Sequence, residues 1–328
     1  MSTSNTIEEQ NETESKPFLT PQRLRKAFPL ILLGVLILVF AMFSDRFLTF
    51  GNGMIVLQQA SVLLVAALGV TFVIMSGSID LSVGSTVALA ALAAALTVDV
   101  LGVWALFPAM LVGALAGSVS GFIFAWGKVP SFIVTLGAMV VYRGLVLLFT
   151  RGAPVSVFDA GFLDVFGGRT LGVPNAAIIS LSAALVCHVI LTRTVFGKEV
   201  KAIGGGERVA YLTGIRVRRV KFIMFAFAGL LCGLAGLLQS ARTMAATAQL
   251  GEGLELDVIA AVVVGGTPLT GGVGGIGGTL LGVLIITILS NGMNMIGVDP
   301  YIQYLTKGVV LVLAVFITID RSKIGVIK

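Results

Sequence analysis

Long apolar runs recur along this chain, and they constrain its fold more than any other feature. A run of about 18 or more apolar residues can cross a hydrocarbon core of roughly 30 Å as a helix. Of the 328 residues, 57% are hydrophobic and 12% are charged, whereas soluble domains carry about 25% charged residues. We therefore predict an all-α integral membrane protein in a lipid bilayer rather than a set of soluble domains.

The runs predict about ten transmembrane helices, with broken or re-entrant Gly-rich segments, in a single transmembrane domain over residues 27–320. The run over residues 254–266 is too short to cross the membrane alone unless it bends or extends. A polar N-terminal tail over 1–26 is expected to be disordered because its hydrophobicity is low, and a second tail covers 321–328. The expected spans are residues 27–44, 54–75, 81–98, 104–126, 131–149, 175–191, 221–240, 254–266, 276–296 and 301–319.

Basic residues follow one set of loops, and this asymmetry predicts the orientation. With the N-terminus in the cytoplasm, an even number of spans returns the C-terminus there, in a multi-pass protein of the bacterial inner membrane. The net charge of +6 then reflects the inner loops and predicts no nucleic-acid partner. The inner basic residues are Lys16, Arg23, Arg25, Lys26, Lys128, Arg193, Lys198, Lys201, Arg208, Arg216, Arg218, Arg219, Lys221, Arg321, Lys323 and Lys328, against Arg46, Arg151, Arg169 and Arg242 outside.

Glycine repeats mark two of the runs. Gly113, Gly117 and Gly121 recur every four residues in one span, and Gly229 and Gly233 repeat this spacing in another. Small residues at this spacing let two helix backbones approach closely in lipid. We expect these glycines to form tight helix–helix contacts.

Two segments interrupt apolar runs with turn-forming residues, at 75–85 and at 264–278. Non-helical backbone at membrane depth is tolerated where protein or a water-filled cavity satisfies its polar groups, so such breaks point to a transport path. The orientation above puts both near the cytoplasmic face. A better inverted pair is 77–80 with 253–257, which fall on opposite sides. Interfacial turns without a transport role are the alternative.

A polar, basic loop over about 192–221 offers a surface on which a soluble partner can act. Its small apolar residues and glycines suit docking, and three adjacent glycines allow a sharp turn between short helices. The alternative is a solvated basic loop that only fixes topology. The residues expected to couple to a partner are Ala202, Ile203, Gly204, Gly205, Gly206, Glu207, Ala210 and Gly214, with Val209 and Leu212 as further apolar contacts.

Polar groups within the spans are candidates for a substrate path, because such groups tend to face the interior of a helix bundle. Hydrogen bonding across helices is the alternative role. Arg143 and Lys307 are charges inside predicted spans, and we expect Arg143 to reach an interface by snorkelling. The path candidates are Asp80, Ser82, Gln239, Asn291 and Asn294.

The sequence carries no signal for catalysis. It has no G-x-x-x-x-G-K-[ST] phosphate loop, so hydrolysis of ATP by that route is excluded. No nucleophile–base constellation and no Cys/His cluster are visible, and His188 is the only histidine. Cys187 and Cys232 both lie in apolar runs as expected of buried thiols. We predict no catalytic residue, no metal site and no cofactor bound by this chain.

Four motifs together resemble one family. They are Gly-Ser-Ile-Asp-Leu-Ser-Val-Gly at 77–84, Ala-Ile-Gly-Gly at 202–205, the segment 256–267, and Asn-Gly-Met-Asn at 291–294. The chain is similar to the permease subunit of bacterial ABC importers for monosaccharides, of the ribose/xylose/galactoside type. Ser78 stands where the family usually has Gly, and Gly206 where Asn is common.

The resemblance implies partners. It implies two permease subunits side by side, a cytoplasmic ABC ATPase that uses the ATP, and a periplasmic sugar-binding protein. The loop over 192–221 would then dock the ATPase. The outer loop over 151–174 could dock the binding protein, although a structural cap is an equal alternative. An ion-coupled secondary transporter of a small polar solute is the competing function, with Asp80 and Asp257 as its most plausible carboxylates.

Overall fold

The computed structural model describes residues 21–318, and the fold is almost entirely helical. Residues 1–20 of the predicted N-terminal tail and the whole predicted tail over 321–328 lie outside the described residues. The first helix begins at Pro21 rather than at Ala27. The long helices are α1 (Pro21–Phe43), α2 (Phe50–Met75), α3 (Val83–Leu101), α4 (Leu106–Gly127), α5 (Ser131–Thr150), α7 (Asn175–Arg193), α10 (Val217–Thr243), α12 (Ile276–Met295) and α13 (Pro300–Thr318).

Short elements connect them. Two antiparallel strand pairs, β1 with β4 and β2 with β3, are the sheet structure of the described chain. The short elements are the 3-10 helix η1 (Gly102–Ala105), α6 (Ala160–Phe162), the π-helical turn η2 (Leu163–Gly167), α8 (Val195–Gly205), α9 (Glu207–Leu212) and α11 (Leu254–Val264), with β1 (Val155–Ser156), β2 (Arg169–Thr170), β3 (Val173–Pro174) and β4 (Ala245–Ala246).

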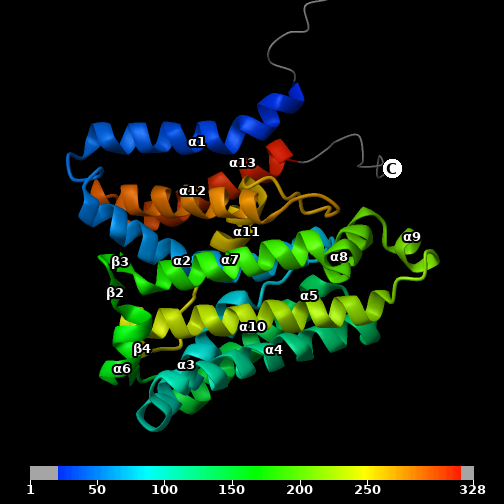
Figure 1. Ribbon diagram of the computed structural model, residues 1–328, viewed down its shortest axis with the longest axis horizontal. Helices are drawn as coiled ribbons and strands as arrows, with labels where there is room; N and C mark the ends of the chain where they lie inside the picture. The colour runs from blue at the N-terminus through cyan, green and yellow to red at the C-terminus, as the bar shows by residue number, and fades with distance from the viewer. Residues whose placement is uncertain (1–20, 319–328) are drawn as a thin grey trace, which may run out of the picture.

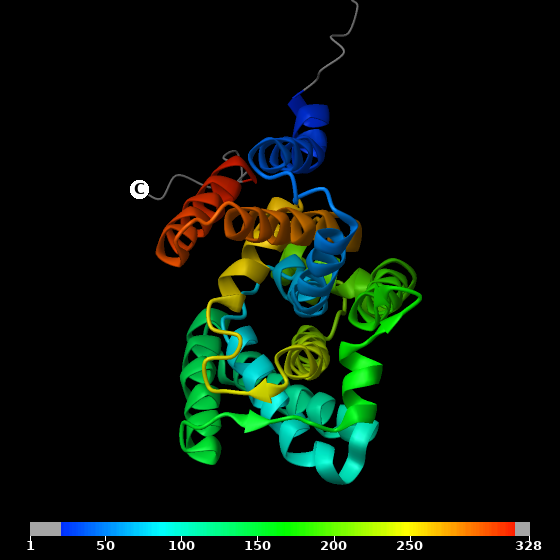
Figure 2. The ribbon, with the colours of Figure 1, turned by 90° about the vertical axis from the view of Figure 1, so that its left-hand side faces the viewer.

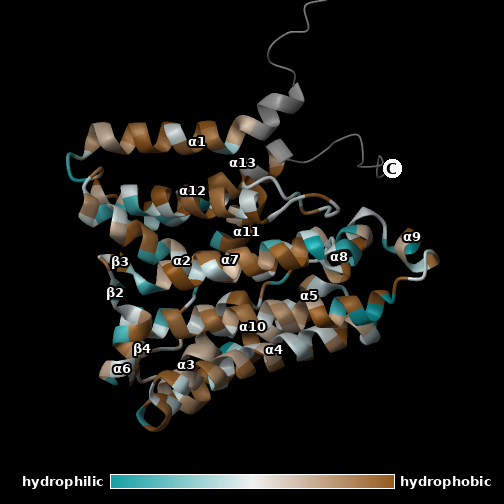
Figure 3. Cartoon of the chain, in the orientation of Figure 1, coloured by the Kyte–Doolittle hydropathy of each residue, from teal (hydrophilic) through white to brown (hydrophobic). Residues whose placement is uncertain are grey.

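Six helical stretches are long and apolar enough to cross a membrane, counted over the described residues. Every range expected to span overlaps a helix, and the hydrophobic colouring follows these helices (Figure 3). The expected count of about ten crossings is not confirmed. α3 and α4 count as one continuous stretch over 83–127, α11 has 11 residues, the apolar part of α1 is short, and α13 is not among the six. The fold class, a multi-pass α-helical membrane protein, is confirmed.

Helices α1, α7 and α10 run along the longest axis of the molecule (Figure 1). At one end lie α8 and α9, and we call this the α8–α9 end. At the other, which we call the strand end, lie α6 and the four strands. Viewed from the strand end, α10 occupies the centre, with α2, α3 and α4 packed around it (Figure 2).

Glycines allow α10 and α4 to pack at backbone distance, as the repeats predicted. A Cβ on Gly113 would overlap the backbone of Gly229 and Gly233, and one on Gly117 would lie 3.0 Å from the Cα of Gly229. Side chains larger than hydrogen therefore cannot be accommodated here without moving one of the helices. The expectation of tight helix contacts at these glycines is confirmed.

Two polar contacts hold α2 against α12. Asn52 and Asn291 exchange reciprocal amide hydrogen bonds, each 3.0 Å long. Nearer the other end of α2, the hydroxyl oxygens of Thr71 and Thr279 lie 2.7 Å apart. All four side chains are buried, so each polar group is satisfied across the helix interface rather than by water.

Candidate functional site

The two broken segments meet at the α8–α9 end, close to the expected coupling loop. The backbone N–H of Gly272 donates to the carbonyl of Met75, with an N···O distance of 2.8 Å. A Cβ on Gly271, which has a φ of +77°, would lie 2.6 Å from the amide nitrogen of Gly77. Positive φ favours glycine, and so does this close approach of two backbones. The sequence placed both breaks at one face, and the structure joins them directly.

Gly204, near the end of α8, packs against both breaks at once. A Cβ at Gly204 would overlap the carbonyl oxygen of Met75 and the amide nitrogen of Gly272. By contrast, a Cβ at Gly205 would meet no atom within 4 Å. The backbone of α8 is therefore in contact with both interruptions of the membrane helices. A displacement of α8 must move them or break this contact.

The coupling loop folds into two short helices, α8 and α9, which are joined at Gly206. Thr194 caps α8 by accepting a hydrogen bond from the backbone N–H of Gly197, and α8 continues through Gly204 and Gly205. The chain leaves the helix only at Gly206, and α9 starts at Glu207. The expected turn between two short helices is therefore present, but only Gly206 forms it, because Gly204 and Gly205 belong to α8.

Side-chain exposure separates the inner and outer faces of this loop. Ile203 and Ala210 are each 2% exposed, so their side chains support the loop from within. Val209, Tyr211 and Leu212 are exposed by 66–74%, and they form an apolar outer face on α9. Ala202 and Gly214 are also exposed. Docking of a partner through this loop stays a prediction, with α9 as its surface.

A polar cavity of about 300 Å³ lies among α2, α10, α11, α12 and α13. Its volume is at the lower end of the range of ligand pockets. Two of the five path candidates, Gln239 and Asn294, line it. Its other polar lining residues are Gln59, Arg242, Glu252, Asp257, Thr287, Ser290 and Lys307.

The charged groups and one hydroxyl of this lining decide what the cavity can bind. Arg242 and Glu252 contribute one positive and one negative charge. Asp257 and Lys307 form an ion pair with an O···N distance of 2.7 Å, so their charges compensate each other. Thr287 is 4% exposed, and its hydroxyl has no hydrogen-bond partner. A buried hydroxyl without a partner is destabilising, and a solute hydroxyl can satisfy it only if the helices around Thr287 move to expose this oxygen. Amides and hydroxyls without excess charge suit a neutral, polar solute.

The other three path candidates lie elsewhere. The carboxylate of Asp80 is 4% exposed and accepts hydrogen bonds from the backbone N–H and the hydroxyl of Ser82, at 2.8 and 2.6 Å. These two residues shape the turn into α3. Asn291 is engaged with Asn52, as described above. Asp80 and Ser82 thus bond to each other within a turn and Asn291 bonds across helices, and the place of these three residues in a substrate path stays a prediction.

Thr287 and Ser290 line the cavity but were not among the path candidates predicted from the sequence, because single hydroxyl residues are common in apolar helices. Their spacing held a signal: positions 287, 290 and 294 are three and four residues apart, which places them on one helix face. Arg143 donates to the backbone carbonyls of Ala248 and Leu250 in the segment before α11, and its reach to a membrane interface stays a prediction. That segment needs such a donor because its carbonyls have left regular structure.

The proposed inverted pair of segments gains a geometric counterpart. Gly84, at the start of α3, and Gly251, just before α11, are in backbone contact. From there α3 leads to the β1–β4 pair at the strand end, whereas α11 leads to the breaks at the α8–α9 end. Two helices that start together after a break in the chain and then diverge are typical of inverted transporter repeats. The repeat itself stays a prediction.

Comparison with known proteins shows which protein family the chain belongs to. The chain is 42% identical over 312 residues to the ribose import permease protein RbsC of Escherichia coli (strain K12), covering 93% of this chain and 97% of that protein. It is 41% identical over 319 residues to the RbsC of Bacillus subtilis (strain 168), covering 96% and 98%. It is 33% identical over 314 residues to the D-allose transport system permease protein AlsC of Escherichia coli (strain K12), covering 94% and 95%.

No solved structure matches the chain. Residues 53–315 match the family described as branched-chain amino acid transport system / permease component. The matched range includes both broken segments, the α8–α9 loop and the residues that line the polar cavity. This chain is therefore a member of that family of transport permease components.

Proposed function

We propose that this chain is the permease subunit of an ABC importer, which moves a monosaccharide delivered by a periplasmic binding protein and is driven by a separate cytoplasmic ATPase. The contact of Gly204 with both broken segments is the observation that carries this proposal, since it connects an exposed loop to the membrane interior. The curated relatives are named as permeases for ribose, D-allose and L-arabinose. The chain is accordingly a transport subunit and not an enzyme.

The ATPase docks on the outer face of α9 in this proposal. Val209, Tyr211 and Leu212 provide exposed apolar area for a groove in the ATPase. Glu207 is paired with Lys221 at 2.7 Å, so it stabilises the root of the loop instead of meeting the partner. A movement imposed on α9 passes to α8 and through Gly204 to both breaks. The ATP is used by the partner, and this chain binds no cofactor of its own.

The α8–α9 end faces the cytoplasm in this proposal, with both termini on that side. It carries Lys128 at the end of α4, Arg193 at the end of α7 and the basic residues of the loop that follows. Only a few basic residues, such as Arg151 and Arg169, lie toward the strand end. This distribution supports a cytoplasmic α8–α9 end by the positive-inside effect.

The strand end then receives the binding protein. Leu171 is 99% exposed at the tip of the β2–β3 hairpin, and Phe158 before α6 is 76% exposed. Asp159 is used locally, because its carboxylate accepts from the N–H of Phe162 at 2.7 Å and caps α6. Apolar tips on a cap that is fixed by β1–β4 pairing suit a transient docking surface. A homodimer of permease subunits completes the proposed assembly.

The polar cavity provides part of the substrate path. Gln239, Asn294 and the unpartnered hydroxyl of Thr287 offer hydrogen bonds to the hydroxyl groups of a neutral sugar. The competing idea of an ion-coupled transporter gains no support, because the relatives are permease components. Its two carboxylates are engaged as well, Asp80 with Ser82 and Asp257 with Lys307.

Reconstitution tests the proposal. Vesicles containing this chain, its ATPase and the binding protein are expected to accumulate sugar only when ATP is present on the ATPase side. Vesicles with this chain alone are expected to accumulate none, even under an imposed proton or sodium gradient. Uphill accumulation by the chain alone would overturn the proposal.

Removal of single polar groups tests the cavity. Thr287→Val keeps the shape of the side chain and removes the unpartnered hydroxyl, so we expect equal or slightly higher thermal stability but about fivefold slower sugar uptake. Gln239→Leu is expected to slow uptake to a similar degree. Gln58→Leu is the control, because Gln58 adjoins Gln59 on α2 but does not line the cavity. Unchanged uptake in both cavity variants would remove this cavity from the path.

A further inference from the structure

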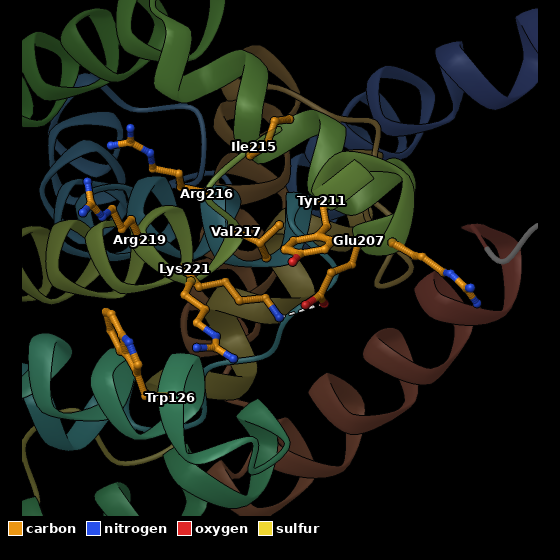
Figure 4. Close-up of a pocket in the computed structure, with 10 residues that line it drawn as sticks. Trp126, Glu207, Tyr211, Ile215, Arg216, Val217, Arg219 and Lys221 are labelled. Carbon is orange, nitrogen blue, oxygen red and sulfur yellow. Dashed lines mark hydrogen bonds and ion pairs between the residues drawn. The ribbon is translucent and has the colours of Figure 1, made fainter. Parts of the chain in front are cut away.

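A basic pocket of about 800 Å³ opens at the α8–α9 end, outside the cavity described above. Its walls come from the end of α4, from α9 and from the first turns of α10. Figure 4 shows Glu207 and Tyr211 of α9 on one side, Trp126 of α4 on another, and Lys221 between them, bound to Glu207. Arg216 and Arg219 line the far side of the pocket, and their guanidinium groups point away from Glu207 and Tyr211. The pocket adjoins the proposed ATPase surface through Tyr211, but its lining on α4 and α10 has no role in the proposed transport mechanism.

The pocket carries an excess of positive charge. Its single carboxylate, Glu207, is already bound to Lys221, whose ammonium also lies 4.4 Å from the centre of the Phe124 ring. Four further cationic side chains line the pocket, all are exposed, and none has an ion-pair partner among the described residues. These are Arg208, Arg216, Arg218 and Arg219. Four unpaired guanidinium groups around one space favour an anion with several acceptor oxygens.

The apolar surroundings indicate which anion. Trp126 is 41% exposed at the end of the membrane-spanning helix α4, and its ring stacks on that of Phe122 at 5.1 Å. Tryptophan in this position is typical of the membrane–water interface. From Trp126, an exposed apolar row runs back along one face of α4 at spacings of three and four residues. The row consists of Phe122, Val119, Leu115 and Leu111, each 54–60% exposed.

We propose that this pocket binds the phosphate headgroup of an anionic phospholipid, with an acyl chain lying along the apolar row of α4. A basic pocket between membrane helices, with an aromatic side chain at its rim, fits such a headgroup. A soluble phosphate would use only the arginines and leave the adjoining row without a role. A phospholipid uses both the arginines and the apolar row, because its charged headgroup and its acyl chains belong to one molecule.

The two tryptophans of the chain allow a direct test. Trp104 lies in η1 near the strand end, so a Trp104→Phe variant of the full chain reports fluorescence from Trp126 alone. We would reconstitute it in phosphatidylcholine vesicles that contain brominated phosphatidylglycerol or, in a parallel series, brominated phosphatidylcholine at equal mole fraction. The result expected is stronger quenching by the anionic brominated lipid, weakened by high salt.

Arginine variants identify the site. In the Trp104→Phe background, Arg216→Gln and Arg219→Gln are each expected to lower the preference for phosphatidylglycerol by about fivefold. Arg193→Gln with Lys198→Gln is the matched control, because these two exposed cations lie at the same end but outside the pocket. The reciprocal Trp126→Phe variant, which reports from Trp104, is expected to show no preference.

Two outcomes would overturn the assignment. Equal quenching of Trp126 by the two brominated lipids would show that the pocket does not select an anionic headgroup. A preference that survives both pocket arginine changes, together with loss of ATPase co-purification in those variants, would assign the pocket to the ATPase instead. Neither readout requires transport, so the result stands apart from the success or failure of the proposed function.

Discussion

Gly204→Ala is expected to reduce ATP-driven sugar uptake at least tenfold in vesicles that contain the complete importer. The added methyl would overlap the carbonyl of Met75 and the amide nitrogen of Gly272, both of which are backbone atoms. Backbone cannot move aside as a flexible side chain can, so α8 must withdraw from one or both breaks. Uptake and ATP hydrolysis should be measured on the same vesicles, and hydrolysis is expected to continue without transport.

Gly205→Ala is the matched control for this change. It adds the same methyl one residue further along the same helix, where no atom lies within 4 Å. Alanine also favours a helix over glycine by about 1 kcal/mol, so this variant should fold and transport at least as well as the original. Equal uptake by the two variants would contradict a coupling role for the contact at Gly204.

The second large effect is expected for Gly229→Val, where α10 crosses α4. A Cβ at Gly229 would overlap the carbonyl of Gly113 and lie 2.9 Å from the Cα of Gly117. Overpacking of this kind costs about 1–3 kcal/mol, and we expect the upper part of that range because both neighbours are backbone. The midpoint of thermal unfolding in detergent should fall clearly.

Gly34→Val provides the comparison for this variant, since Gly34 lies in α1 and a Cβ there meets nothing within 4 Å. Its unfolding midpoint should stay close to that of the original chain, because surface changes are usually within about 0.5 kcal/mol. If the two variants lost stability equally, the loss would reflect valine in a helix and not the crossing of α4 and α10.

Hydropathy and glycine spacing predicted much of the fold. The expected span 131–149 corresponds to α5 at Ser131–Thr150, and the run over 254–266, judged too short to cross, is the 11-residue α11. Turn-forming residues located both breaks, since glycine and proline interrupt helices for local reasons. The contact of Gly113 and Gly117 with α10 followed from their four-residue spacing. All of these features depend on residues close together in the sequence.

The polar cavity could not be predicted to the same degree. Asn291 and Asn294 look alike in the sequence, but one bonds to Asn52, 239 residues away, and the other lines the cavity. Helices that are apolar on every side give little sign of which face turns inward. Gly204 is a similar case: its need for glycine comes from Met75 and Gly272, which are distant in the sequence. Such roles depend on tertiary contacts.

The double attachment of α2 to α12 restricts how this protein can change shape. The Asn52–Asn291 and Thr71–Thr279 contacts are separated by about 28 Å along α2, taking 1.5 Å per residue. Two anchors so far apart prevent one helix from sliding past or swivelling about the other. In the proposed transport cycle we therefore expect α2 and α12 to move together as one unit, with the bending in the glycine-rich segments that flank them.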